Sequence, residues 1–99
     1  MFGANWVLKL NFTPQARDDL IIIRDWIAID NEQAADRVLS RIRQTVEMFA
    51  QFPMLGRKGR VADTREFPVT GLPYLIVYRI ASNDDIDILT VMHSSRNYP

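Results

Sequence analysis

The residues best suited to chemistry lie in the second half of the 99-residue chain. The segment GRKGRVADTR, from Gly56 to Arg65, carries four cations against one aspartate, a local charge of +3. Its cations are Arg57, Lys58, Arg60 and Arg65. Such a basic segment can hold phosphate groups or an acidic protein surface, although an ordinary solvated loop can have the same composition.

Other candidate groups lie toward the C-terminus. His93 is the only histidine, and histidine is the residue type that most readily exchanges a proton near neutral pH. Arg96 could hold phosphate and Tyr98 could stack on a nucleic-acid base. Terminal residues are often frayed, which is the alternative interpretation of this pair.

Composition excludes several other kinds of site. The chain has no cysteine and one histidine, which excludes disulfides, thiolate metal sites and all-histidine metal sites. Phosphate-loop, dinucleotide-binding and HExxH motifs are missing from the sequence, so we expect no cofactor and no metal. Twelve basic residues balance twelve acidic ones, so a polyanion can be held only by a local patch such as the basic segment.

Hydrophobic periodicity predicts the elements that position these groups. A single domain over residues 1–99 is expected, because so short a chain cannot bury two separate cores. Alternation predicts a strand over Trp6–Phe12. A helix should follow with Thr13 as its cap and Trp26 widening its apolar stripe. A second helix should begin at Asp30 and end before Pro53, and it should pack against the first as an antiparallel hairpin.

Three further strands are predicted over Arg65–Val69, Tyr74–Ala81 and Ile86–His93. The order β-α-α-β-β-β defines an α+β fold, with an N-terminal strand and a helical hairpin packed on a mainly antiparallel four-stranded sheet. No leader segment or membrane span is expected, since apolar runs such as Leu20–Ile23, with four residues, are far shorter than a membrane span. We therefore expect a cytoplasmic protein.

The last hairpin predicts which side chains share a face of the sheet. A three-residue loop over Asn83–Asp85 would align Ile80 with Ile88 and Tyr78 with Thr90. Arg79 and His93 would then share the other face, roughly 13 Å apart along the strands. Asp87 would lie diagonally opposite Arg79 and could form an ion pair with it.

Four phrases in this order give the sequence its resemblance: FTPQARDDL, NEQAADRVLSRIRQTVEMFAQFPMLGRKGR, TREFPVTGLPYLIVYRI and ILTVMHSSRNYP. Over roughly Leu10–Pro99 the chain resembles the RelE/ParE superfamily of type II toxin-antitoxin toxins. The resemblance implies a small toxin, neutralised by a cognate antitoxin in a hetero-oligomer. RelE-like members cut mRNA on the ribosome, whereas ParE-like members poison DNA gyrase.

The resemblance implies different roles for the same residues in the two branches. Metal-independent RNA cleavage needs a base, an acid and cations on the phosphate. The residues matching the nuclease pattern are Arg65, Arg79 and His93. Arg65 could instead pair with Asp63 or Glu66, and the H-x-x-R phrase beginning at His93 also fits the ParE-like branch.

The neutral charge balance favours the ParE-like branch, because a ribosome-dependent nuclease must dock among RNA phosphates. We therefore expect a toxin that arrests growth by binding gyrase. The alternatives are an mRNA endonuclease using Arg65, Arg79 and His93, and a non-toxic binding module of the same fold. In each case Arg57, Lys58 and Arg60 are expected to contact a partner or a phosphate.

Overall fold

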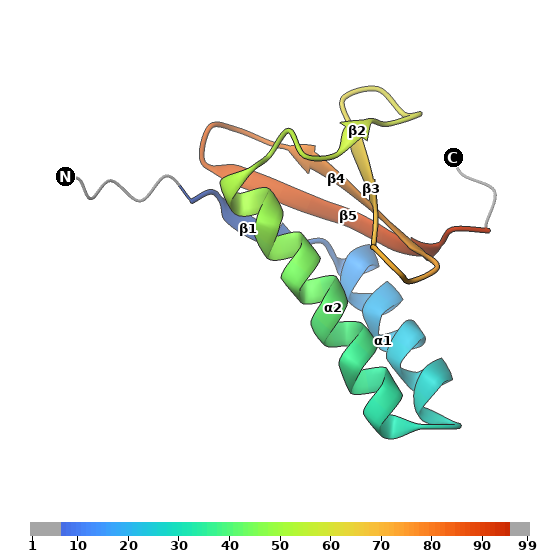
Figure 1. Cartoon of the computed structure of the whole chain (residues 1–99). Helices are drawn as coiled ribbons and strands as arrows, with labels where there is room; N and C mark the ends of the chain where they lie inside the picture. The colour runs from blue at the N-terminus through green and yellow to red at the C-terminus, as the bar shows by residue number, and fades with distance from the viewer. Residues whose placement is uncertain (1–6, 96–99) are drawn as a thin grey trace.

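The computed structural model describes residues 7–95 and has two helices on one face of a mixed sheet (Figure 1). The elements are β1 (Lys9–Phe12), α1 (Pro14–Ala28), α2 (Glu32–Gln51), β2 (Arg57–Lys58), β3 (Arg65–Pro68), β4 (Tyr74–Ile80) and β5 (Asp85–His93). The sheet order is β1-β5-β4-β3-β2, and only the β1–β5 pair is parallel. The predicted fold class is confirmed, but the sheet has five strands instead of four because part of the basic segment forms β2.

Side-chain caps begin both helices. The Thr13 hydroxyl accepts a hydrogen bond from the Ala16 N–H at 3.1 Å, and Pro14 occupies the first helical position, as predicted. The predicted cap of α2 is wrong by one residue. Asp30 lies in the turn after α1, and the amide oxygen of Asn31 accepts from the Ala34 N–H at 3.0 Å.

The main core lies between the helical hairpin and the sheet. Phe49 of α2 stacks on Tyr78 of β4, with ring centroids 4.1 Å apart, and meets Phe67 edge-on. Ala16 and Ile23 of α1 pack in the same cluster. Trp26 was predicted to extend this buried stripe, but 75% of its surface is exposed. The buried face of α1 is therefore narrower than its apolar sequence suggests.

The predicted register is wrong at the turn, and a bulge in β5 then shifts the pairing by one residue. Ile80 pairs with Ile86 instead of Ile88, and Tyr78 pairs with Ile88 instead of Thr90, so the loop end of the hairpin is two residues away from the predicted register. The next pair is Val77 with Thr90, so Leu89 is an extra residue in β5. One extra residue reverses the alternation of the side chains that follow it. Val91 consequently packs in the helix-covered core, while Met92 packs with Leu75 and Val77 on the opposite face.

The start of α1 is bonded to this bulge. Thr13 donates its N–H to the Ile88 carbonyl at 3.1 Å and its hydroxyl to the Leu89 carbonyl at 3.0 Å. The buried carboxylate of Asp19 accepts from the Val91 N–H at 3.0 Å and from the Thr90 hydroxyl. These bonds fix α1 against β5, and so they also fix the orientation of the hairpin on the sheet.

We expect Asp19→Ala to lower the free energy of unfolding by about 2–3 kcal/mol, because it leaves a buried backbone N–H without a partner. Urea unfolding followed by circular dichroism would measure the change. Asp18→Ala is the matched control, since Asp18 is exposed on the same helix and should change stability by less than about 0.5 kcal/mol. Equal effects of the two substitutions would contradict the role assigned to Asp19.

Candidate functional site

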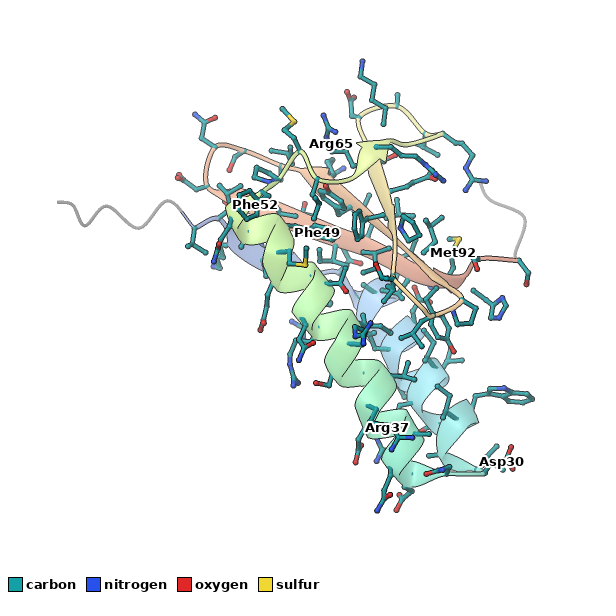
Figure 2. The ribbon with its side chains drawn as sticks, viewed as in Figure 1. Asp30, Arg37, Phe49, Phe52, Arg65 and Met92 are labelled. Atoms are coloured by element: carbon teal, nitrogen blue, oxygen red, sulfur yellow. The ribbon has the colours of Figure 1, made fainter. Side chains whose placement is uncertain are left out.

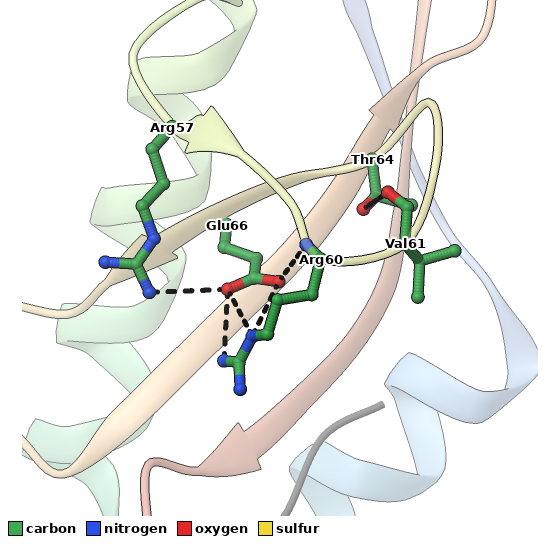
Figure 3. A network of polar contacts seen from close by, with 5 residues as sticks. All are labelled: Arg57, Arg60, Val61, Thr64 and Glu66. Atoms are coloured by element: carbon green, nitrogen blue, oxygen red, sulfur yellow. Dashed lines mark hydrogen bonds and ion pairs between the residues drawn. The ribbon is translucent and has the colours of Figure 1, made fainter.

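The basic segment is organised by a buried carboxylate, Glu66 of β3. Its side chain is 1% exposed, yet it meets the Arg57 guanidinium at 3.3 Å and the Arg60 guanidinium at 3.1 Å. The backbone N–H of Arg60 donates to the second carboxylate oxygen at 2.9 Å (Figure 3). Arg57 lies directly opposite Glu66 in the β2–β3 ladder, which brings one of these cations to the carboxylate.

Glu66 is held in its charged form. Burial by itself raises the pKa of the carboxyl group, but hydrogen bonds from the side chain and backbone of Arg60 and from Arg57 outweigh it, so the net pKa lies below the ordinary value of 4.5. Two cations of the basic segment therefore share an internal counter-ion. The positive charge that this segment presents to a partner is smaller than its sequence alone suggests.

Arg65 and Tyr78 hold the loop that joins α2 to β2. Arg65 donates to the Gly56 carbonyl at 2.6 Å. The ion pair with Asp63 or Glu66 that the sequence suggested for Arg65 is not formed. The buried Tyr78 hydroxyl accepts from the Gly56 N–H at 2.7 Å and donates to the Pro53 carbonyl at 2.8 Å. A Cβ at position 56 would lie 2.8 Å from the Tyr78 ring, so this close approach requires glycine.

Arg79 forms the ion pair predicted for it. Its guanidinium lies 2.9 Å from the Asp87 carboxylate, and the two residues are directly opposite each other in the β4–β5 ladder. Arg79, Arg65 and Lys58 also line an open hollow of about 680 Å³. The other lining residues are Gly59, Val61, Ala62, Asp63, Thr64, Ile80 and Ala81, none of which is a histidine, glutamate or tyrosine.

His93 lies far from these arginines. Its ring contacts Tyr74 edge-on, with centroids 5.8 Å apart, and its Nδ1 is 2.7 Å from the Ser95 hydroxyl. Six residues of β5 separate His93 from Asp87, the partner of Arg79, a span of roughly 20 Å at the rise of a strand. The bulge also turns His93 toward the helix-covered face, so the predicted shared face with Arg79 is wrong.

Two candidates from the sequence, Arg96 and Tyr98, lie outside the described residues, and their roles stay predictions.

The described part of the chain also bears on metal sites and membrane spans. Within residues 7–95, no cluster of three or more histidine, cysteine, aspartate or glutamate side chains could hold a metal ion. Neither helix in that range is long and apolar enough to cross a membrane.

Sequence reasoning missed two features of this region. It considered Glu66 only as a partner of Arg65, although the strand pairing places Glu66 beside Arg57 instead. It also missed the exposed apolar side chains Phe52, Met54 and Leu55, which immediately precede the basic segment. The sequence did indicate them, because large apolar residues lie on both sides of Pro53, where the predicted helix ends and its apolar face no longer continues.

Comparison with known proteins identifies the family. Residues 10–98 match the model of the ParE toxin of the type II toxin-antitoxin system parDE, and the chain belongs to this family. It is 40% identical over 91 residues to the putative toxin Y4kP of Sinorhizobium fredii, covering 92% of this chain and 93% of that protein. It is 33% identical over 85 residues to toxin RelE2 of Caulobacter vibrioides, covering 86% and 93%.

Solved structures support the same fold. The chromosomal ParDE system of P. aeruginosa aligns with a TM-score of 0.79 at 22% identity, over 90% of this chain and 98% of that chain. The RelBE2 toxin-antitoxin complex of Mycobacterium tuberculosis aligns with a TM-score of 0.65 at 22% identity, over 88% and 98%. The chain is thus a type II toxin of the RelE/ParE superfamily, and its relatives carry names from both branches.

Glu66→Gln should lower the free energy of unfolding at pH 7 by about 1–3 kcal/mol, because it removes the buried negative charge that the Arg57 and Arg60 guanidiniums share. The pKa of Glu66 is lower in the folded protein than in the unfolded chain. Its contribution to stability is therefore complete at pH values above the pKa of the unfolded chain, and it is lost as pH falls through the pKa of the folded protein. The difference between wild type and variant should therefore narrow below about pH 4. Urea unfolding between pH 3 and 7 tests this, with Glu47→Gln on the exposed face of α2 as control.

Tyr78→Phe should cost about 1–3 kcal/mol at pH 7, because the Gly56 N–H and the Pro53 carbonyl lose their partner. Burial raises the pKa of Tyr78 above the ordinary 10.0, so the unfolded chain releases this proton before the folded protein does. Wild-type stability should then fall as pH rises past about 10, and the phenylalanine variant should lack that part of the fall. Urea unfolding of both proteins from pH 8 to 11 measures this difference.

Proposed function

We propose that this toxin arrests growth by binding and poisoning DNA gyrase, that it does not cleave RNA, and that a cognate antitoxin neutralises it in the cytoplasm. The observation that supports gyrase binding over RNA cleavage is the separation of His93 from Arg65 and Arg79. A metal-independent nuclease must place a base, an acid and phosphate-binding cations around one scissile bond. Here the histidine is on a different face of the sheet from Arg79 and well beyond hydrogen-bonding reach of it.

The arginines themselves have structural partners. Arg65 bonds to a backbone carbonyl and Arg79 to a carboxylate, so part of each guanidinium is already engaged within the fold. The whole chain is also formally neutral, which disfavours docking among ribosomal RNA phosphates. Both observations favour a target recognised through protein contacts.

One observation favours the RelE-like alternative, an mRNA endonuclease. Arg65, Arg79 and Lys58 line the same hollow, which could accept a phosphate group. Among its lining residues, Asp63 and Lys58 are of types that can serve in general acid–base catalysis, and Lys58 is also one of the cations. The hollow therefore has cations for binding RNA, but its lining has no histidine, glutamate or tyrosine to assist in cutting it.

The antitoxin is proposed to bring acidic groups to the basic segment. Lys58 is exposed, and no carboxylate within the described part of the chain lies within ion-pair distance of it. Arg57 remains 64% exposed at its side chain despite its contact with Glu66. These two cations can approach a partner carboxylate without refolding of the segment, and complementary charge speeds association.

Purified toxin should inhibit DNA supercoiling by gyrase and leave mRNA on translating ribosomes intact. Arg65→Ala, Arg79→Ala and His93→Ala, checked for folding by circular dichroism, should each retain inhibition to within about threefold of wild type if no covalent chemistry depends on them. Codon-positioned mRNA cuts that disappear in these variants, with normal supercoiling, would overturn the proposal. Expression without growth arrest and without either activity would support a non-toxic binding module.

A further inference from the structure

An exposed apolar patch lies beside the basic segment, at the end of α2 opposite Asp30 (Figure 2). It consists of Met48, Phe52, Met54 and Leu55, with exposed fractions of 45%, 61%, 67% and 38%. Met48 and Phe52 are one helical turn apart, since the Phe52 N–H donates to the Met48 carbonyl at 2.9 Å. Large apolar side chains gathered on a surface in this way are typical of a protein-binding site.

The patch is held in place before any partner arrives. The Leu55 N–H donates to the Phe52 carbonyl at 3.0 Å, which closes the loop on itself. The Tyr78 hydroxyl joins the Pro53 carbonyl to the Gly56 N–H, and Arg65 binds the Gly56 carbonyl. A partner therefore meets an ordered backbone, and binding does not have to offset the entropy of ordering this loop.

The charges next to the patch define the partner's chemistry. Arg57 and Lys58 follow Leu55 and Gly56 directly in sequence and are exposed on the edge strand β2. A segment that covers the patch with apolar side chains would bring its neighbouring residues over these cations. Carboxylates at those positions would gain charge-assisted contacts, whereas lysine or arginine would be repelled.

A second exposed apolar surface has the opposite surroundings. Ile22, Trp26 and Ile29 lie along one face of α1 and are 66%, 75% and 76% exposed. Asp18 and Asp25 lie beside this stripe at the spacing of two helical turns and are exposed. Arg24 lies 3.8 Å from Asp25 and offsets part of its charge, whereas two exposed cations follow the patch directly. The α1 stripe is therefore the less favourable surface for an acidic segment.

We propose that Met48, Phe52, Met54 and Leu55 anchor an acidic amphipathic segment of the antitoxin, whose carboxylates meet Arg57 and Lys58. This inference rests on the proposed function only in requiring a neutralising antitoxin. It assigns the main apolar contact to the end of α2 and the loop before β2, and it leaves the α1 stripe outside that contact.

The test compares two surface double variants with wild type. The probe is the antitoxin that restores growth when it is co-expressed with the toxin, and titration calorimetry measures its affinity. Phe52→Ser with Met54→Ser should weaken binding by about 30-fold or more, as expected for loss of anchor residues. Trp26→Ser with Ile29→Ser, on the α1 stripe, should change it by less than about threefold.

Lys58→Glu adds an electrostatic measurement. It should slow association and reduce its salt dependence, with a smaller effect on dissociation. Two results would overturn the docking site. One is wild-type antitoxin affinity in the Phe52/Met54 variant. The other is a loss of affinity in the Trp26/Ile29 variant as large as the loss in the Phe52/Met54 variant. Thermal unfolding of each variant confirms that it is folded.

The experiments distinguish a wrong docking site from a wrong proposed function. Inhibition of gyrase is measured with wild-type toxin in the absence of antitoxin, so it does not depend on the patch. Wild-type toxin that leaves gyrase active, combined with the expected loss of antitoxin affinity, would refute gyrase poisoning and retain the docking site. Inhibited gyrase with unchanged antitoxin affinity in the Phe52/Met54 variant would do the reverse.

Discussion

The bulge at Leu89 is the constraint on which the arrangement of this protein depends. It adds one residue to β5, and the start of α1 bonds to the backbone that the bulge exposes through Thr13 and Asp19. The same residue decides that Val91 and His93 face the helices while Met92 faces away. Without it, α1 would lose hydrogen bonds to β5, and the end of β5 would present the opposite set of side chains.

Two buried polar side chains organise the loop before β2 and the basic segment that follows it. Glu66 collects Arg57 and Arg60, and Tyr78 joins the ends of the Pro53–Gly56 loop. Both groups are fully partnered, which is the condition under which a buried polar group stabilises a fold. Together they convert a short, charged stretch of sequence into an ordered surface with an apolar part and a basic part.

Local pattern was sufficient for most of the fold. Thr13 and Pro14 marked the start of α1, and the periodicities gave the helices and the main strands within a few residues. The predicted register was wrong because the loop of the last hairpin covers residues 81–84, whereas a loop over Asn83–Asp85 was predicted. The bulge was missed because β5 has no glycine or other mark at Leu89, and the bulge is stabilised by contacts with α1, which is distant in sequence. Asp30 and Asn31 are both good caps, so only the path of the chain between the helices could choose between them.

The candidate site was less predictable for the same reason. The Arg79–Asp87 ion pair follows from any register of that hairpin near the one observed, and it was anticipated. Glu66 escaped notice because its partners depend on β2, a strand of two residues that carries no hydrophobic pattern. For Arg65 the sequence suggested either a phosphate or a neighbouring carboxylate as its partner. Its partner is a backbone carbonyl, which sequence composition cannot reveal.

The position of β5 between β1 and β4 also has a consequence for how the chain acquires its structure. Among the elements of residues 7–95, β1 is synthesised first, but its strand partner follows it by 76 residues, as in the Lys9–Asp85 pair. β5 is the last of these elements, and α1 also packs on it. A nascent chain that stops before β5 lacks the strand that joins β1 to β4, and long-range pairing of this kind is slow. An interrupted translation product would therefore lack the folded surfaces of the toxin.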